Sequence, residues 1–222
     1  MGISIAIDGP AGAGKSTIAK QAASEIGFIY VDTGAMYRAI GLYFLRKDCW
    51  EEEEIIKECH SNHISVTIKY KGQIQQVLLN GENVSELIRT EEVGKITSFV
   101  SKIGAVRELL LELQRGLAKE HNVIMDGRDI GTTVLPNAQV KIYLTASSKE
   151  RAKRRYKELK EKGIACNLEK IEKDIIARDE QDINREISPL RQASDAILID
   201  TSFMGKDEVV EKVISLYIEY TR

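Results

Sequence analysis

The sequence predicts an α/β fold, in which a five-stranded parallel sheet is wrapped by helices and carries a small antiparallel insert. Five short apolar segments alternate with helical stretches along the chain, which is the pattern of a parallel sheet. A glycine-rich loop with the spacing G-x-x-x-x-G-K-S stands between the first predicted strand and the first predicted helix. One region instead alternates apolar and polar residues, which is typical of half-exposed antiparallel strands.

The glycine-rich loop spans residues 9–16 and reads GPAGAGKS. Ile3–Ile7 before it is apolar and rich in β-branched residues, and the stretch from Thr17 onward favours a helix. Glycines let backbone N–H groups turn inward around a phosphate, and the helix N-terminus adds unsatisfied donors. We expect Lys15, as an exposed loop charge, to meet the β/γ-phosphates, and the Ser16 hydroxyl to ligate Mg²⁺. The alternative is a glycine-rich turn with a chance lysine.

The other elements follow from hydrophobic periodicity and from residues that stop helices. Glycines divide or end two of the predicted helices, near Gly104 and at Gly163. The remaining parallel strands are predicted at 28–31, 123–125, 140–144 and 196–200. Helices are predicted at 35–45, 51–59, 91–119, 149–162, 168–182 and 206–220.

The antiparallel insert is predicted at residues 62–88. Ile64–Tyr70 alternates apolar and polar side chains, as a half-exposed strand does. Asn80-Gly81 is a strong signal for a two-residue hairpin turn between strands at 76–79 and 82–84.

Composition excludes several classes of protein. The chain has 222 residues and a net charge of −2, so it lacks the excess of positive charge that is typical of nucleic-acid-binding and membrane-binding proteins. Its three cysteines are far apart and form no C-x-x-C pair, which favours ordinary thiols in a reducing cytosol. The first strand begins almost at once and leaves no room for a signal peptide, so we expect a cytoplasmic protein. We also expect the protein to act as a monomer.

Polar residues gather after three of the predicted strands or on the helices that follow them, where ligands of open α/β sheets bind. Residues 32–38, which read DTGAMYR, could receive an anion, or could be a helix cap with a surface arginine. Residues 126–132, DGRDIGT, crowd charge at the end of a buried strand, which suits either a ligand site or a closed ion pair. An arginine series follows on two helices, and it could neutralise a transferring phosphoryl group or belong to a solvated basic surface. Its members are Arg151, Arg154, Arg155, Arg178 and Arg185.

Several motifs occur together in one chain: residues 7–16, 32–38, 88–90, 126–132, 178–179, 184–185 and 188–190. With them the chain resembles the bacterial cytidylate kinases over nearly its whole length. The resemblance implies a P-loop kinase fold in a single domain over 1–222. The insert at 62–88 would extend its monophosphate-binding region, and residues 151–167 would form a short helical lid. It also implies direct in-line transfer of the γ-phosphoryl group of ATP, with Mg²⁺, to CMP or dCMP.

The resemblance further implies roles for individual residues. Catalytic roles would fall to Lys15, Arg128, Arg178 and Arg185. ATP would contact Gly9, Pro10, Ala11, Gly12, Ala13, Gly14, Lys15, Ser16, Thr17, Arg151 and Arg155, with Ser16 as metal ligand. CMP would contact Thr33, Arg38, Ser98, Arg107, Arg128, Asp129, Asp182 and Arg185. Asp129 would accept from the cytosine amino group, while the role of Gln181 stays open because relatives often carry a basic residue there.

Two alternatives remain at the level of sequence. One is a kinase of the same fold that acts on UMP or on an acceptor that is not a nucleotide. The other is a nucleotide-switched regulatory protein, which would require guanine-reading and switch motifs that the sequence lacks.

Overall fold

The computed structural model describes residues 2–222 and confirms the predicted α/β class. Its larger sheet has five strands in the order β2-β6-β1-β7-β8, and its smaller sheet has three strands in the order β3-β4-β5. The chain divides into two compact units, which we describe separately. Residues 3–28 with 124–222 are called the phosphate-loop unit, and residues 29–123 with Gly2 are called the insert unit.

The phosphate-loop unit holds the glycine-rich loop and most of the larger sheet. Its elements are β1 Ser4–Asp8, α1 Lys15–Ile26, β6 Val123–Gly127 (whose first residue belongs to the insert unit), a π-helical turn Ile130–Val134, β7 Val140–Thr145, α6 Ser148–Glu161, α7 Leu168–Asn184, β8 Ile197–Asp200 and α8 Lys206–Tyr220.

The core of this unit forms around β1, whose five residues are all buried. β1 pairs in parallel with β7, and Ile7 lies opposite Ile142. α1 packs beside α8, and the rings of Phe28 and Tyr217 meet edge to face at 5.1 Å between centroids. Because paired parallel strands end at the same edge, Asp8 and Tyr143 face each other there and the loop after β1 emerges beside β7.

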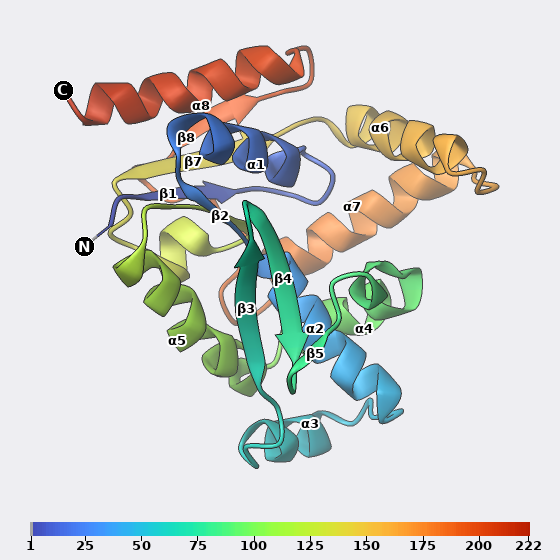
Figure 1. The fold of residues 1–222 in the computed structure, drawn as a ribbon. Coiled ribbons are helices and arrows are strands. Elements are labelled where there is room, and N and C mark those ends of the chain that lie inside the picture. The colour runs from blue at the N-terminus through green and yellow to red at the C-terminus, as the bar shows by residue number, and fades with distance from the viewer. Residues whose placement is uncertain (1) are drawn as a thin grey trace. The chain divides into compact units, whose positions relative to one another are not determined.

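The insert unit contains β2 Ile29–Asp32, α2 Thr33–Arg46, α3 Glu52–Cys59, β3 Val66–Lys71, β4 Ile74–Leu79, β5 Glu82–Asn83, a 3-10 helix Leu87–Arg89, α4 Glu91–Val100 and α5 Gly104–Glu120. β3 and β4 run antiparallel side by side, and the small sheet lies inside the predicted range 62–88 (Figure 1). The predicted hairpin is confirmed: Leu79 pairs with Glu82, and Asn80 and Gly81 have φ of 49° and 85°.

α4, α5 and the 3-10 helix pack against α2, and α3 packs against α5. A Cβ on Gly41 would lie 2.4 Å from Thr97 Oγ1, so this glycine lets α2 and α4 approach each other. The predicted break near Gly104 is confirmed, because α4 ends at Val100 and α5 begins at Gly104. Gly163 likewise follows α6 with φ of 71°, as expected of a residue that ends a helix.

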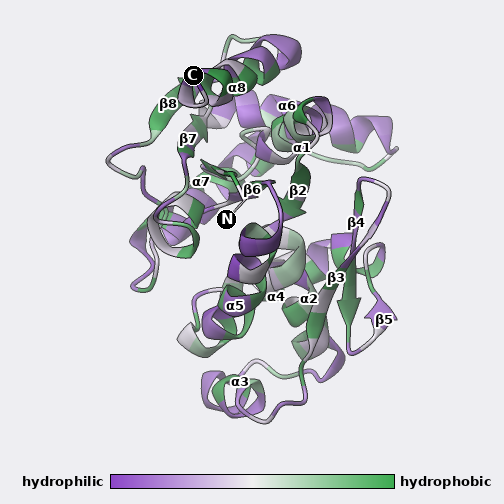
Figure 2. Ribbon diagram, turned by 60° about the vertical axis from the view of Figure 1, so that its left-hand side comes forward, coloured by the Kyte–Doolittle hydropathy of each residue, from purple (hydrophilic) through white to green (hydrophobic). Residues whose placement is uncertain are grey.

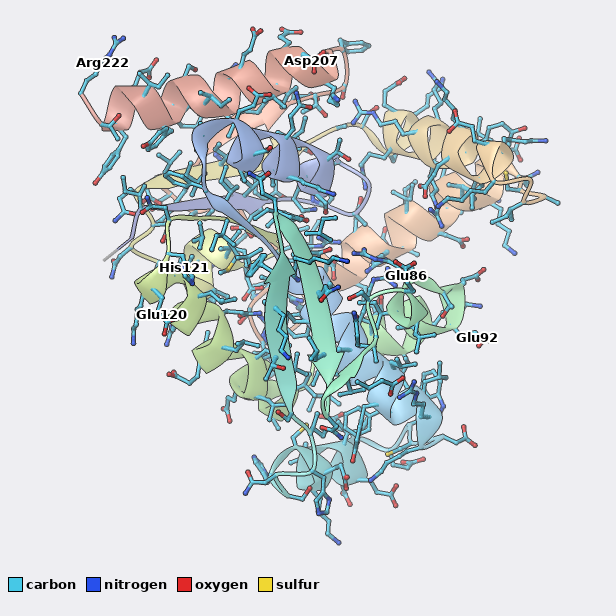
Figure 3. The ribbon with its side chains drawn as sticks, viewed as in Figure 1. Glu86, Glu92, Glu120, His121, Asp207 and Arg222 are labelled. Atoms are coloured by element: carbon cyan, nitrogen blue, oxygen red, sulfur yellow. The ribbon has the colours of Figure 1, made fainter. Side chains whose placement is uncertain are left out.

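Hydrophobic residues concentrate on the strands, as the colour of β8 shows in Figure 2. Charged side chains project from the helix surfaces in both units, for example Glu92 on α4 and Asp207 on α8 (Figure 3). Among residues 2–222, none of the helices combines the length and the apolar character that crossing a membrane requires.

Candidate active site

The glycine-rich loop joins the end of β1 to the first residue of α1, as the sequence predicts. Gly9 has φ of 148°, and a Cβ on it would lie 1.9 Å from the carbonyl oxygen of Leu144, so only glycine fits there. Gly12 and Gly14 also have positive φ, of 76° and 92°. The N-terminal N–H groups of α1 therefore open onto a tightly turned backbone, which is an arrangement suited to binding phosphate.

Lys15 is buried rather than exposed, which corrects the sequence-based expectation. Its side chain is 6% exposed, and its ammonium donates to the carbonyl oxygens of Gly9 and Pro10 at 2.8 Å each. Burial, followed by the positive charge of Arg128, lowers the pKa of Lys15. The folded loop holds this cation over its own backbone because the short span from Gly9 to Lys15 leaves the side chain little choice of direction.

Ser16, which the sequence predicts as a metal ligand, lies beside the carboxylate of Asp126. The Ser16 hydroxyl donates to Asp126 Oδ2 at 2.8 Å, and Asp126 at the end of β6 is 4% exposed. Among residues 2–222 the model contains no group of three or more His, Cys, Asp or Glu residues that could hold a metal. A hydroxyl and a carboxylate alone fit a hard cation that takes its remaining ligands from phosphates and water.

Residues 126–132 place two charged side chains in ion pairs with α7 and the residue that follows it. Arg128 Nε donates to Asp182 Oδ2 at 2.8 Å. An Arg185 Nη2 group donates to Asp129 Oδ1 at 3.3 Å, and both of these side chains are buried. The closed ion pairs considered from the sequence are therefore present. They pair Arg128 with Asp182 and Arg185 with Asp129, and all four residues are expected to bind the acceptor.

The charges of these residues also act on one another and on Lys15 of the glycine-rich loop. Burial by itself raises the pKa of Asp182, but the charge and hydrogen bond of Arg128 outweigh it and the pKa is lowered. Arg178 acts on Asp182 in the same direction and lies four residues before it on α7, on the same helix face. Because Arg128 also lowers the pKa of Lys15, these cations form one electrostatically coupled cluster.

The arginines of α6 point in different directions. Arg151 is buried, donates to the carbonyl oxygen of Ala11 at 2.9 Å, and pairs with Asp179 of α7. Arg155, which we expected at ATP, lies on the exposed side of the helix and pairs with Glu158 at 2.7 Å. Arg151 therefore joins α6 and α7 to the glycine-rich loop. Arg155 instead pairs with a residue of its own helix.

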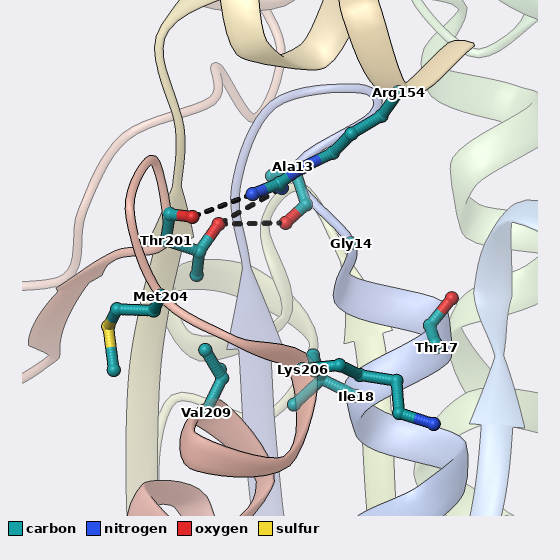
Figure 4. Close-up of a pocket in the computed structure, with 9 residues that line it drawn as sticks. All are labelled: Ala13, Gly14, Thr17, Ile18, Arg154, Thr201, Met204, Lys206 and Val209. Atoms are coloured by element: carbon teal, nitrogen blue, oxygen red, sulfur yellow. Dashed lines mark hydrogen bonds between the residues drawn. The ribbon is translucent and has the colours of Figure 1, made fainter. Parts of the chain in front are cut away.

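A pocket beside the glycine-rich loop was not predicted from the sequence (Figure 4). Arg154 Nη1 and Nη2 donate to the hydroxyl and carbonyl oxygens of Thr201 at 3.1 and 2.6 Å. The Thr201 hydroxyl in turn contacts the carbonyl oxygen of Ala13 at 3.5 Å. The pocket is lined by Ala13, Gly14, Thr17, Ile18, Arg154, Thr201, Met204, Lys206 and Val209. The sequence shows the run of basic residues on α6, but it does not show which of these arginines faces the loop.

The insert unit carries the other expected acceptor-binding residues. Arg38 Nη1 donates to the carbonyl oxygen of Ile88 at 3.2 Å, and a Cβ on Gly94 would lie 3.5 Å from the same nitrogen. Arg38 thus lies against α4 one turn before Ser98. Arg107 is buried, donates to the carbonyl oxygen of Ser101, and lies over the ring of Tyr37 at 5.4 Å.

A residue of the small sheet binds the backbone just before Thr33. The sequence did not reveal this contact. Gln75 of β4 accepts from the Asp32 backbone N–H at 2.9 Å and donates to the Asp32 carbonyl at 3.1 Å. Asp32 also caps α2 by accepting from Ala35 N, and Thr33 at the start of that helix is 2% exposed. The insert therefore fixes the backbone at a predicted nucleoside contact.

Comparison with known proteins finds close relatives. A family model described as cytidylate kinase matches residues 5–219. The cytidylate kinase of Caldicellulosiruptor bescii is 50% identical over 222 residues, which cover 99% of this chain and 97% of the relative. That of Shouchella clausii is 47% identical and covers 100% of this chain and 98% of the relative. A solved structure of an uncharacterised Eubacterium ventriosum protein aligns over 100% of both chains, with 12% identity and a TM-score of 0.53, and so shares the fold alone.

Proposed function

This chain belongs to the cytidylate kinase family, and we propose that the loop, the ion pairs and the pocket described above form its ATP and acceptor sites. The protein is an ATP-dependent nucleoside monophosphate kinase, which transfers a phosphoryl group from ATP to CMP or dCMP. The single observation that best supports the site is the hydrogen bond between Ser16 and Asp126, which joins the loop at Lys15 to the end of β6 at Arg128 and so gathers both cations in one cluster. Phosphoryl transfer requires cations around the developing charge, and this cluster supplies them.

Transfer is direct and in line, with no covalent enzyme intermediate. The N–H groups of the glycine-rich loop hold the ATP phosphates, and Lys15 exchanges its carbonyl partners for phosphate oxygens. Arg128, Arg178 and Arg185 neutralise charge on the acceptor phosphate and the transferred group, and Arg38 binds the acceptor phosphate. Positioning and charge neutralisation account for catalysis, because phosphoryl transfer needs little covalent chemistry from the protein.

The acceptor nucleoside is recognised by polar side chains matched to the hydrogen-bonding groups of cytosine and ribose. Ser98 and Arg107 donate to the acceptor edge of cytosine, and Asp129 accepts from its amino group. Thr33 contacts the nucleoside and Asp182 bonds the ribose. This assignment is supported by the chemistry of each side chain and by the burial of Arg107 and Asp129, which keeps water from competing.

A divalent cation accompanies ATP in kinases, and we assign it as Mg²⁺ held by Ser16 and Asp126. Both ligands are hard oxygens in hydrogen-bond contact, and Mg²⁺ usually binds proteins through only one or two side chains plus phosphates. Ser16 and Asp126 would hold the metal, which would help to neutralise the negative charge of the ATP phosphates. Residues 151–167 serve as the lid over the bound nucleotide. The protein works as a monomer, and its substrates are free nucleotides.

A screen of acceptors tests the function. We expect initial rates with ATP and Mg²⁺ to be high for CMP and dCMP, low for UMP, and at background for AMP and shikimate. The rates are measured as ADP release and checked by identifying the diphosphate product. A preference for UMP or for shikimate would contradict the assignment. Slow ATP hydrolysis that needs no acceptor would instead favour a regulatory switch.

The pocket of Figure 4 binds the nucleoside of ATP, because it adjoins the loop that holds the phosphates. We expect Arg154→Met to raise KM for ATP about tenfold, since a cation facing a base or ribose contributes about 1–2 kcal/mol. Arg155→Met is the matched control, because Arg155 is one residue away on the same helix and its exposed side chain pairs with Glu158. KM for ATP is measured at saturating CMP. Equal effects of the two substitutions would contradict this assignment.

A further inference from the structure

Asp8 is the last residue of β1, and its carboxylate binds the backbone that directly follows Asp129. Asp8 Oδ1 accepts from the N–H of Ile130, and Oδ2 accepts from the N–H of Gly131, each at 2.7 Å. The side chain is 5% exposed. Because the two oxygens bind successive N–H groups, they fix both the place and the direction of this stretch of backbone.

The space between Asp8 and the turn is closed. A Cβ placed on Gly131 would lie 3.3 Å from Asp8 Oδ2 and 3.2 Å from Lys141 Cδ. The side chain of Lys141 is itself held in place, since its ammonium donates to the Pro136 carbonyl and to Asp195. A glycine at 131 is therefore what permits the close approach of the turn to both Asp8 and Lys141.

Stability does not explain why this residue is a carboxylate. Burial raises the pKa of Asp8 to about 6 even though both N–H bonds lower it; nearby Asp129 raises it further and Lys15 lowers it. A pKa above the ordinary value means that the folded protein disfavours the charged form relative to the unfolded chain. Buried charges that do not stabilise a fold can serve to fix geometry instead.

We propose that Asp8 is a positioning residue for recognition of the acceptor base: it holds the backbone of residues 130–131 so that Asp129 presents its carboxylate to cytosine. This rests on the proposed function, in which Asp129 reads the base. Asp129 is then held from two sides, by Arg185 at its carboxylate and by Asp8 through the adjoining backbone. The strand that leads into the ATP-binding loop thereby also sets the geometry of acceptor selection.

Asp8→Asn tests the proposal with little change in volume. One amide oxygen can still accept, but the amide nitrogen would face the second N–H, so the turn loses one of its two constraints. We expect the ratio of kcat/KM for CMP to that for UMP to fall about five- to tenfold, with KM for ATP nearly unchanged. A loss of folded protein alone would lower both rates equally and leave the ratio unchanged.

Three further variants make the test specific. Gly131→Ala should lower the same ratio with Asp8 intact, because it pushes the turn away. Asp200→Asn, at the end of the edge strand β8, should leave the ratio unchanged, because that exposed carboxylate accepts from the N–H and hydroxyl of Ser202. Asp8→Asn added to Asp129→Asn should lower the ratio no further, because Asp8 acts through Asp129.

An unchanged ratio in both Asp8→Asn and Gly131→Ala would overturn the proposal, as would full additivity with Asp129→Asn. If Asp8→Asn does not fold, the proposal is tested by the same ratio in Gly131→Ala and in its combination with Asp129→Asn. Wild-type protein that fails to phosphorylate CMP would refute the proposed function instead. Wild-type protein that prefers CMP, with variants that keep this preference, would refute only the role of Asp8.

Discussion

Lys15→Ala is expected to lower kcat by about 10²–10³-fold, the size of effect that follows the loss of one preorganised charge at a transition state. The Lys15 ammonium lies against the turned backbone of the glycine-rich loop, where it donates to the Gly9 and Pro10 carbonyls at 2.8 Å each. The effect should appear mainly in kcat, because the charge is needed most when negative charge develops on the transferred group.

The fold should survive this substitution even though Lys15 is buried. Burial lowers the pKa of Lys15, so the charged form is already disfavoured in the folded protein, and its removal relieves that cost. We expect the thermal midpoint to change far less than in Leu144→Ala, where a fully buried strand residue is truncated at a cost of about 2–5 kcal/mol. Lys20→Ala, at an exposed position on the same helix, is the control for activity. Retained turnover with a large loss of stability would contradict the catalytic role.

Most of the fold could be predicted from the sequence because local signals agree with the final structure. Asn80-Gly81 requires two residues with positive φ, and the hairpin turn between β4 and β5 provides them. Gly104 and Gly163 mark helix boundaries for equally local reasons. The π-helical turn Ile130–Val134 was not predicted, because its first two N–H groups are bound by the carboxylate of Asp8, which lies far away in the sequence.

The candidate site was predicted less completely, because burial and direction depend on tertiary contacts. The sequence identified Lys15 but not its burial, which follows from two carbonyls of its own loop. It could not tell whether Arg154 or Arg155 faces the loop, since adjacent helical residues differ by about 100° and no local signal fixes the helix rotation. Gln75 and Asp8 were missed for a similar reason: each binds backbone that lies far away in the sequence.

Asp129→Asn is expected to narrow the preference for CMP over UMP, chiefly by weakening the use of CMP. Cytosine presents an amino group to the carboxylate, whereas uracil presents an oxygen that the carboxylate repels. An unsatisfied buried polar contact costs about 1–3 kcal/mol, which corresponds to a ratio of about 5–150-fold. The asparagine amide can turn to donate to the uracil oxygen, and it can still accept from Arg185, so the ion-pair geometry is largely kept.

Arg128→Ala is the matched comparison, since Arg128 adjoins Asp129 but would bind the phosphate that both acceptors share. It should lower kcat/KM for CMP and UMP by similar factors, and larger ones than Asp129→Asn, because it also leaves Asp182 without its partner at 2.8 Å. Both ratios come from initial rates at saturating ATP with each acceptor varied. If Asp129→Asn left the CMP-to-UMP ratio unchanged while Arg128→Ala shifted it strongly, the base-reading and phosphate-reading roles would be reversed. The assignment therefore depends on which of two neighbouring residues changes the choice of base.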